Sequence, residues 1–278
     1  MQAEYIFLSP ERQALMAKYE AAERIAVGYA MDYPDGLVSG MHSHPRAQLV
    51  YGITGVMRVE TEDALFVLPP TKALLLPAGE QHSIAMEGKV AMRELFMDQG
   101  IAQAVANEAR VMAVSPLLRE LIVAICNEPV DWELGGRTPH IIALILDEIK
   151  RARTLLTRLP LPRDHRLSRV AQAIIANPSD PRSLEDWAET CGASSRTLAR
   201  LFHRETGISF GQWRLQARLN AAFVLLMTHG DIPLVADAVG FGSQSAFGVA
   251  FRRTFGITPG QARTLHLHPN SGVETTDV

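Results

Sequence analysis

This sequence has few cysteines and no long apolar runs. Its 278 residues include two cysteines, Cys126 and Cys191, and these form neither a disulfide framework nor a zinc-binding spacing. The longest apolar runs, Ala221 to Met227 and Ile141 to Leu146, are far shorter than the roughly 20 residues of a membrane helix. The N-terminus carries an early acid and no apolar signal segment. We therefore expect a soluble, reduced, cytoplasmic protein that makes no membrane contact.

The common enzyme motifs are also missing. The sequence contains no Gly-rich phosphate-binding loop and no nucleophile elbow. We therefore predict no catalytic residues and no enzymatic activity.

Lysine is absent from residues 164 to 265. This stretch holds eleven arginines and eight acids, a net charge of +3, whereas the rest of the chain carries −6 and the whole chain −3. The asymmetry fits a C-terminal part that faces nucleic acid, but it does not establish one.

Residues 24 to 98 have the pattern of β-structure. Short apolar runs alternate with turn residues, which is typical of an antiparallel barrel or sandwich. The predicted strands are Val27 to Ala30, Gln48 to Ile53, Gly55 to Glu60, Leu65 to Leu68, Ala73 to Leu76 and Ala91 to Met97.

The second half of the sequence is mostly helical. Residues 116 to 127 and 138 to 157 are predicted helices, and Leu144, Ile145 and Ile149 belong to an apolar stripe on the second. That stripe is either a dimer contact, which we favour slightly, or a face that packs on the β-domain. Alternating prolines in 159 to 163 indicate an extended linker. We predict domains at 1–100, 101–163 and 164–265, with a frayed tail at 266–278.

An internal repeat is the clearest signal. Residues 194 to 210 and 243 to 259 align at an offset of 49, with identical pairs that include Ser194/Ser243 and Phe202/Phe251. In each copy a serine can cap a helix, residues four apart can bury, and a glycine can end the helix. A short helix and a glycine turn precede each copy, which is the plan of a helix-turn-helix.

One long helix, Ser209 to Thr228, is predicted between the copies. At about 1.5 Å per residue it spans about 30 Å, close to the roughly 34 Å of one DNA turn. Such a spacer can place two second helices in successive major-groove segments. The alternative is a helical domain with a duplicated hairpin and no DNA role, and the repeat with its arginines favours DNA binding.

The second copy resembles the signature of the AraC/XylS family of transcription regulators. The resemblance rests on Gly240 to Phe247, Phe251 to Arg253 and Gly256 to Pro259, and it covers about residues 164 to 265. It implies a helical DNA-binding domain fused to a sensing or dimerising domain. One departure is Gln261 to Arg263, where members usually carry an aromatic residue before the arginine.

Residues near the start of each second helix are the predicted DNA contacts. Arg196 and Arg200 lie on one helix face and can read guanine, and Gln244 can pair with adenine. Arg204, Arg252 and Arg253 lie later and are predicted to contact phosphate. The full predicted set is Ser195, Arg196, Thr197, Ala199, Arg200, Arg204, Gln244, Ser245, Gly248, Val249, Arg252 and Arg253.

The β-domain resembles the cupin superfamily. Gly40 to Gly55, with His42, His44 and Gln48, is similar to the first cupin motif, and Pro77 to His82 is similar to the second. By strand alternation His42, His44 and Gln48 face one side. In metal-binding cupins such positions hold a divalent cation, but Gln48 stands where the family usually has glutamate.

The histidine site has two interpretations. Three imidazoles and one amide oxygen can bind zinc or nickel, with His42, His44, Gln48 and His82 as the candidate ligands of one divalent ion. Alternatively, these residues and Tyr51 line a ligand pocket without metal, which the missing glutamate slightly favours.

The sequence as a whole predicts an α+β protein. An N-terminal antiparallel, cupin-like β-barrel with helices precedes an all-α domain with two helix-turn-helix motifs. We expect a sequence-specific transcription regulator, a homodimer that binds double-stranded DNA and responds to a small-molecule effector. The alternative is a metal-dependent cupin enzyme fused to a DNA-binding domain.

Overall fold

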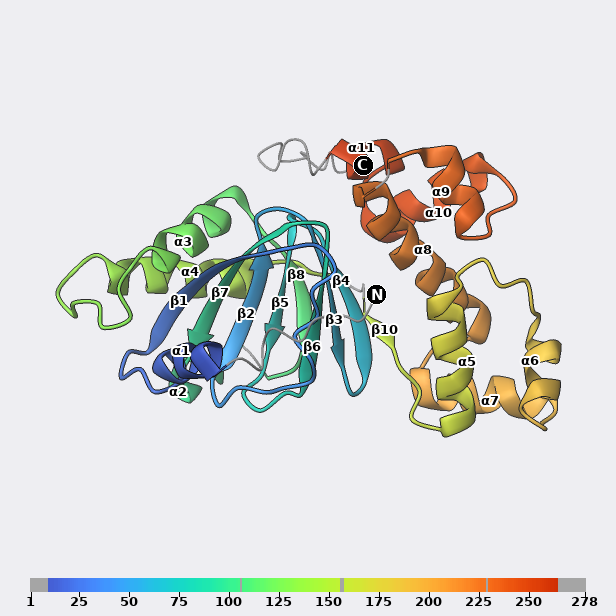
Figure 1. Cartoon of the computed structure of the whole chain (residues 1–278), viewed down its shortest axis with the longest axis horizontal. Coiled ribbons are helices and arrows are strands. Elements are labelled where there is room, and N and C mark those ends of the chain that lie inside the picture. The colour runs from blue at the N-terminus through green and yellow to red at the C-terminus, as the bar shows by residue number, and fades with distance from the viewer. Residues whose placement is uncertain (1–9, 106, 156–157, 229, 265–278) are drawn as a thin grey trace. The chain divides into compact units, whose positions relative to one another are not determined.

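The computed structural model describes residues 10–105, 107–155, 158–228 and 230–264, which form two compact units (Figure 1). The N-terminal unit holds the described residues up to Thr61 and those from Leu68 to Arg158. The C-terminal unit holds Glu62–Val67 and the described residues from Leu159 onward. Antiparallel strands dominate the first unit and helices the second, so the α+β prediction is confirmed. The predicted tail at 266–278 lies outside the described residues.

An antiparallel sheet forms the frame of the N-terminal unit. In another sheet, β3 (Val56–Thr61) pairs antiparallel with β6 (His82–Glu87). The six-stranded sheet that forms the frame has the strand order β1 (Ala26–Tyr33), β7 (Val90–Met97), β2 (Ala47–Gly52), β5 (Lys72–Leu76), β8 (Arg110–Ala113) and β9 (Thr154–Leu155).

The two faces of this sheet bury different side chains. Side chains alternate along a strand, so Leu49 and Tyr51 of β2 lie on one face and Gln48 on the other. Leu49 and Tyr51 belong to a core shared with the helices α3 (Pro116–Cys126) and α4 (Thr138–Arg151). The opposite face carries the residues of the candidate site.

Helix α3 lies close against strands β1 and β7 (Figure 1). A β-carbon added at Gly28 of β1 would come within 2.5 Å of the backbone oxygen of Ile125. Only glycine permits so close an approach of helix to strand. Ser115 caps α3, and its side chain accepts a hydrogen bond from the amide of Leu118.

The apolar stripe of α4 packs inside the chain. Ile145 and Ile149 are fully buried in the core that α4 shares with α3 and the sheet. The expectation that these two residues form a dimer contact is therefore wrong, because their surfaces are already covered. Leu144, the third member, is 48% exposed. Helix α4 also ends at Arg151, earlier than the predicted residue 157, and the chain then enters β9.

Seven helices make up most of the described C-terminal unit. A short ladder pairs β4 (Ala64–Leu68) with β10 (Leu159–Pro160), and the indole nitrogen of Trp213 donates to the Pro160 oxygen at 2.6 Å. Pro160 of the predicted linker thus lies in a strand. The helices are α5 (His165–Ala176), α6 (Leu184–Thr190), α7 (Ser195–Thr206), α8 (Phe210–Thr228), α9 (Ile232–Ala238), α10 (Gln244–Phe255) and α11 (Pro259–Thr264).

The repeat produces two helix hairpins of one design, α6–α7 and α9–α10. Ser194 and Ser243 cap α7 and α10, each accepting from the amide three residues later. Both helices end at a glycine in the left-handed region, Gly207 with φ 74° and Gly256 with φ 77°. The predicted caps and stops are confirmed.

Several elements were not predicted from the sequence. Strand β6 alternates buried and half-buried residues, so its pattern could have revealed it. Strand β8, with four residues, is too short for such a pattern, and helix α1 (Pro10–Glu20) has only weak apolar periodicity. Among the described residues, no helix is both long and apolar enough to cross a membrane.

Candidate functional site

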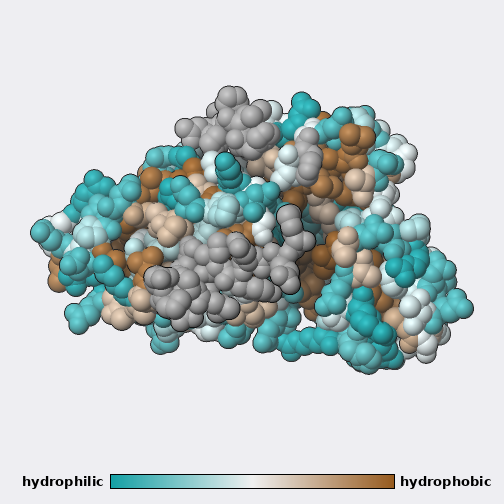
Figure 2. All heavy atoms as spheres, viewed as in Figure 1, coloured by the Kyte–Doolittle hydropathy of each residue, from teal (hydrophilic) through white to brown (hydrophobic). Residues whose placement is uncertain are grey.

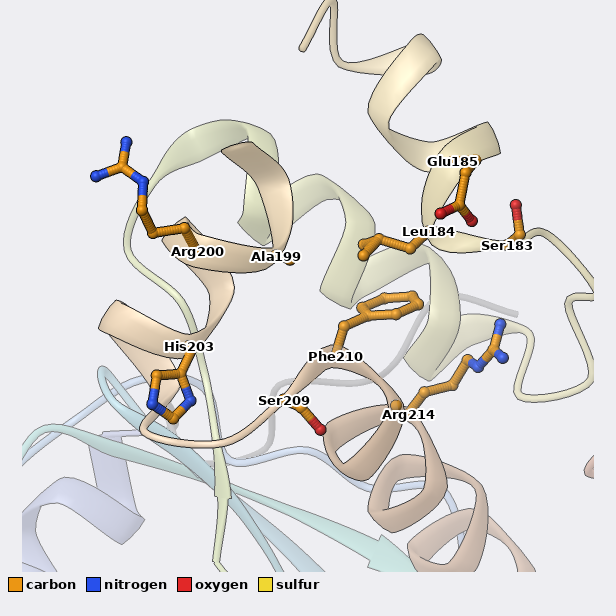
Figure 3. A pocket seen from close by; sticks show the side chains of 10 residues that line it. Ser183, Leu184, Glu185, Ala199, Arg200, His203, Ser209, Phe210 and Arg214 are labelled. Carbon is orange, nitrogen blue, oxygen red and sulfur yellow. The ribbon is translucent and has the colours of Figure 1, made fainter. Parts of the chain in front are cut away.

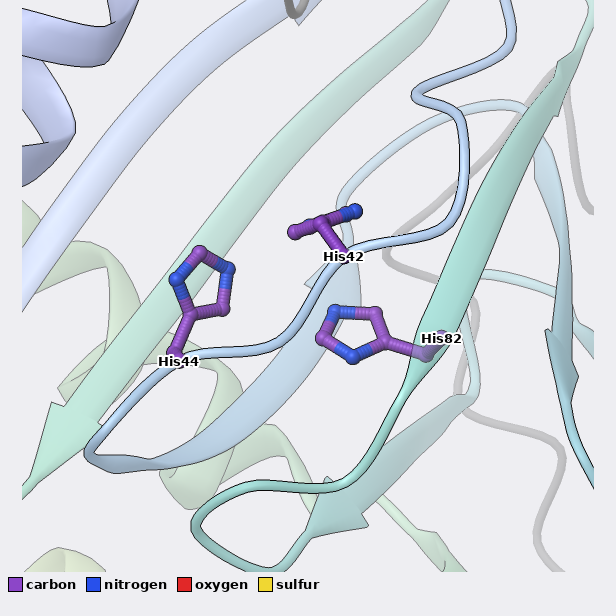
Figure 4. Close-up of side chains that lie close together, drawn as sticks. All are labelled: His42, His44 and His82. Atoms are coloured by element: carbon purple, nitrogen blue, oxygen red, sulfur yellow. The ribbon is translucent and has the colours of Figure 1, made fainter.

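Three histidines form a compact cluster in the N-terminal unit (Figure 4). His42 and His44 lie on the segment before β2, and His82 is the first residue of β6. Reciprocal backbone hydrogen bonds of 2.9 and 2.8 Å join His42 to His82. One ring nitrogen from each histidine lies within 4.8 Å of the other two. The two predicted motifs, far apart in the sequence, are thus brought together.

Each imidazole uses Nδ1 to contact an oxygen. The distances are 2.9 Å from His42 to the Gly40 carbonyl, 2.9 Å from His82 to the Glu80 carbonyl and 2.7 Å from His44 to the Glu20 carboxylate. A carbonyl or an ionised carboxylate only accepts, so Nδ1 carries the hydrogen in each contact. In the neutral ring, Nε2 then keeps its lone pair. Histidines that bind metals are held in the same way by an acceptor behind the ring.

Burial favours the neutral form of His82 and His42. His82 is 1% exposed, and burial, reinforced by the neighbouring His42, lowers its pKa to about 3. Burial likewise lowers the pKa of His42. The buried Nε2 of His82 has no hydrogen-bond partner in the described part of the chain. An unsatisfied buried acceptor costs free energy, so a group that fills this position would stabilise the site.

Gln48 lies on the same face of the sheet as the histidines, and its side chain is hydrogen-bonded to Glu94. Its Nε2 donates to the Glu94 carboxylate at 2.6 Å, which leaves the buried Oε1 without a partner among the described residues. Gln48 pairs with Phe96 across the β2–β7 ladder, and the Phe96 ring lies 5.2 Å from the ring of His44. Gln48 therefore faces the side of the sheet on which the histidines lie.

Tyr51 is the predicted site residue that the structure places elsewhere. It lies three positions after Gln48 on β2 and so points to the opposite face. There it packs in the core with α3 and α4. The prediction that Tyr51 lines the histidine pocket is wrong, because an odd spacing on a strand reverses the side chain.

Glu20 is a site residue that the sequence did not reveal. It is the last residue of α1, and its carboxylate contacts Nδ1 of His44. It is separated from His44 by 24 residues and lies outside both motifs. Only the packing of α1 on the sheet face brings the two side chains together.

The second candidate site is the outward face of the two hairpins. Arg196 and Arg200 are exposed and form no ion pair with any described residue, whereas Arg204 pairs with Glu205 at 3.2 Å. The exposed members of the predicted set are Arg196, Arg200, Arg204, Gln244, Ser245, Val249, Arg252 and Arg253. The half-buried members are Ser195, Thr197, Ala199 and Gly248.

A groove of about 660 Å³ runs between α6, α7 and the start of α8 (Figure 3). Leu184 and Phe210 face each other within it, and the Arg200 guanidinium points away from them. His203 and Arg214 also line the groove, although neither was among the predicted contacts. Arg214 lies one helical turn after Phe210, so helical spacing could have identified it.

The surface of α9–α10 is more apolar. Leu234 is 68% and Val249 is 70% exposed. Figure 2 shows mostly hydrophilic residues over α6–α7 and a larger share of hydrophobic residues over α9–α10. The two hairpins thus have the same caps and glycine stops but differ in surface chemistry.

Comparisons with known proteins agree with this architecture. A model described as an AraC-like ligand binding domain matches residues 26–178, and one described as a helix-turn-helix domain matches residues 187–264. The HTH-type transcriptional regulator NimR of Escherichia coli is 30% identical over 239 residues, which cover 85% of this chain and 87% of NimR.

Two further similar proteins match over a smaller share of their own length or of this chain. The HTH-type transcriptional regulator RipA of Corynebacterium glutamicum is 44% identical over 220 residues, 77% of this chain and 60% of RipA. A solved transcriptional regulator from Chromobacterium violaceum, described as AraC-type, is 34% identical, with coverage of 38% of this chain and 95% of that one and a TM-score of 0.36. With its ligand-binding and helix-turn-helix domains, the chain belongs to the AraC family of transcription regulators.

Proposed function

We propose that α6–α7 and α9–α10 are two helix-turn-helix units whose second helices enter successive major-groove segments. The observation that carries this proposal is the matched capping and burial of α7 and α10, which leave one face of each helix exposed. Helix α8 connects the units and has 19 residues, so it is about 28 Å long. That length is close to the roughly 34 Å turn of DNA.

Helix α7 is the proposed base reader. Arg196 and Arg200 are exposed, unpaired with carboxylates among the described residues, and one helical turn apart. A guanidinium in the major groove can bind guanine through two hydrogen bonds. Ser195, Thr197 and Ala199 complete the proposed contact face of α7.

Helix α10 is proposed to contribute fewer base contacts. Gln244 can pair with adenine, and Ser245, Gly248 and Val249 can fit the groove by shape. Arg252 and Arg253 lie in the last turn and are exposed, as phosphate contacts require. Arg204 has the equivalent role at the end of α7.

Selection of bound DNA from a random pool, repeated at several salt concentrations, tests these roles. We expect a bipartite site and a salt slope that falls by about 0.9 for each phosphate contact removed, as in Arg253→Ala. Enrichment of no sequence would contradict base reading, and an unchanged slope would contradict the phosphate role.

We further propose that the N-terminal unit is a cupin-like barrel that senses a divalent cation. The three histidines fit such an ion because their Nε2 lone pairs are neutral donors, and the buried Nε2 of His82 lacks a partner among the described residues. Imidazole nitrogen suits zinc, nickel and similar ions. His42, His44 and His82 would hold the ion, with the Gln48 oxygen as a candidate fourth ligand. The bound ion would add a fixed positive charge at the histidine cluster.

Metal titration tests this sensing role. Protein purified without a polyhistidine tag and stripped with a chelator should bind one Zn²⁺ or Ni²⁺ per chain, and His82→Ala should abolish binding. The effector regulates only if it changes DNA affinity, so gel shifts are compared with and without the ion. If no metal binds, a small molecule in the same pocket becomes the favoured effector.

The N-terminal unit is proposed to act as a sensor and not as an enzyme. Its chain carries a helix-turn-helix domain, and the relatives described above are named transcriptional regulators. We assign sensing to residues 1–100 and DNA binding to 164–265. Linkage and dimer contact are assigned to 101–163, which belong to the compact N-terminal unit as far as Arg158. Turnover of a bound compound would instead favour a metal-dependent cupin enzyme fused to a DNA-binding domain.

A homodimer on double-stranded promoter DNA in the cytoplasm is the proposed working state. Leu144 is the exposed member of the α4 stripe and is therefore the proposed dimer contact. Sedimentation of the wild type and of Leu144→Glu tests this contact. A wild type that remains a monomer on its DNA would contradict the dimer.

A further inference from the structure

We propose that Glu20 is a positioning residue of the histidine site, so that metal binding and docking of α1 stabilise each other. This inference rests on the proposed metal site. It assigns a role to a carboxylate that lies outside both histidine motifs and that comes from a separate helix.

The contact geometry gives Glu20 an indirect role. Its carboxylate meets Nδ1 of His44 at 2.7 Å, which is the side of the ring away from Nε2. It therefore holds the tautomer and orientation in which Nε2 can bind a cation, and it is not itself a ligand through this contact. In the same position, the rings of His42 and His82 contact the backbone carbonyls of Gly40 and Glu80.

Charge balance gives a second reason. Three neutral imidazoles bring no negative charge to a dication, and Gln48 stands where cupins usually have glutamate. A carboxylate hydrogen-bonded to Nδ1 of His44 places a negative charge behind the ligating ring and makes the imidazole a stronger donor. Glu20 thus supplies through His44 part of what Gln48 lacks.

The position of Glu20 in α1 is unfavourable for the helix alone. It is the last helical residue, where the partial negative charge of the helix C-terminus repels a carboxylate. The hydrogen bond to His44 compensates for this repulsion. A carboxylate at this position is therefore better explained by the histidine site than by helix stability.

The rest of α1 packs next to the same site. Leu15, Met16 and Tyr19 pack against a small core that includes Tyr29 and Phe96. The Tyr19 ring lies 5.1 Å from that of Tyr29 and 6.5 Å from that of Phe96, and Phe96 also contacts His44. Any event that fixes His44 therefore acts on the surface that α1 covers.

Thermodynamic linkage makes the proposal measurable in two directions. If docked α1 strengthens metal binding by some factor, bound metal must strengthen docking of α1 by the same factor. The experiment titrates Co²⁺, followed by its visible absorption, and Zn²⁺ into the stripped full-length protein. It also measures amide hydrogen exchange of α1 with and without Co²⁺.

The variants are Glu20→Ala, Glu20→Gln and the control Glu23→Ala. We expect Glu20→Ala to weaken metal affinity about 10- to 100-fold, the usual effect of losing a partner behind a ligating histidine. Glu20→Gln keeps an accepting oxygen without the charge and should fall between. Glu23 is an exposed acid in the following connection, so Glu23→Ala should bind like the wild type. In the wild type, Co²⁺ should slow exchange of α1.

Separate outcomes distinguish this inference from the metal proposal. Equal Co²⁺ affinity and spectra for Glu20→Ala and wild type would overturn the role of Glu20 while the metal site stands. Exchange of α1 that is the same with and without Co²⁺ would overturn the linkage. A wild type that binds neither ion would remove both proposals. Exchange of β2 and β6 in the stripped variants verifies that the fold is intact.

Discussion

The two hairpins of the C-terminal unit share a design and differ in their surfaces. Their second helices have the same length, the same serine cap and the same glycine stop. The exposed residues of α7 include Arg196 and Arg200, whereas those of α10 include the apolar Val249. A duplicated hairpin therefore keeps the residues that fold it and is free to change those that meet a partner.

The largest expected effect tests whether the cores of the two hairpins are equivalent. Phe202 and Phe251 are the equivalent fully buried aromatic residues of the two hairpins, and each contacts further rings. Replacing either by alanine should lower the free energy of unfolding by about 3–5 kcal/mol, because a large side chain leaves a cavity. Urea denaturation measures both variants, and a loss below about 1 kcal/mol for one of them would show that the cores are not equivalent.

The next effect tests the surface difference. Arg200→Ala should weaken binding to the cognate site by about 1–3 kcal/mol and relax base preference there, because a bidentate contact is lost. Gln244→Ala on α10 should weaken binding less. Arg204 is paired with Glu205 and is a proposed phosphate contact, so Arg204→Ala should weaken binding to all DNA sequences alike. Gel shifts on cognate and random DNA separate these cases. Equal losses on both DNAs for Arg200→Ala would contradict base reading.

A smaller effect tests the helix caps. Ser194→Ala and Ser243→Ala each remove a side chain that accepts from a helix amide, so each should cost about 1 kcal/mol. Thermal unfolding of the two variants beside Ser179→Ala, which is not a helix cap, measures the cost. Losses of stability that differ by more than about 1 kcal/mol between the two variants would show that the two caps are not equivalent.

The smallest expected effect is a pH dependence of the stability that Asp186 gives to α6. Hydrogen bonds from the Ser183 amide and hydroxyl lower the pKa of Asp186. A carboxylate with a lowered folded pKa adds stability that is present above its unfolded pKa, about 3.9, and is lost as the pH falls. Asp186→Asn should therefore differ from the wild type in stability near pH 6 and lose this difference in acid. A difference that persists at low pH would contradict the role of the charge.

The C-terminal unit was predictable because its signals are local. A serine three residues before an amide, apolar residues four apart and a glycine after the last turn act within one helix. Ser194, Phe202 and Gly207 therefore revealed α7 without any knowledge of its neighbours. The same rules found α10 and the long helix α8.

The N-terminal site was only partly predictable because its contacts are distant. Motif spacing identified His42, His44 and His82, but the wrong face was assigned to Tyr51 and Glu20 was missed. A position on a strand decides its face only when the register is known. The weak apolar periodicity of α1 does not predict which surface the helix packs against.

The sequence by itself determined the order of the domains, the duplicated hairpins and the residues that cap and end their helices. Local backbone and side-chain chemistry suffices for these features, since each depends on residues within one or two turns. Only the tertiary structure decided which oxygen each imidazole Nδ1 contacts, that Ile145 and Ile149 are buried, and that Glu20 meets His44. These outcomes depend on packing between segments far apart in the chain, which no local pattern encodes.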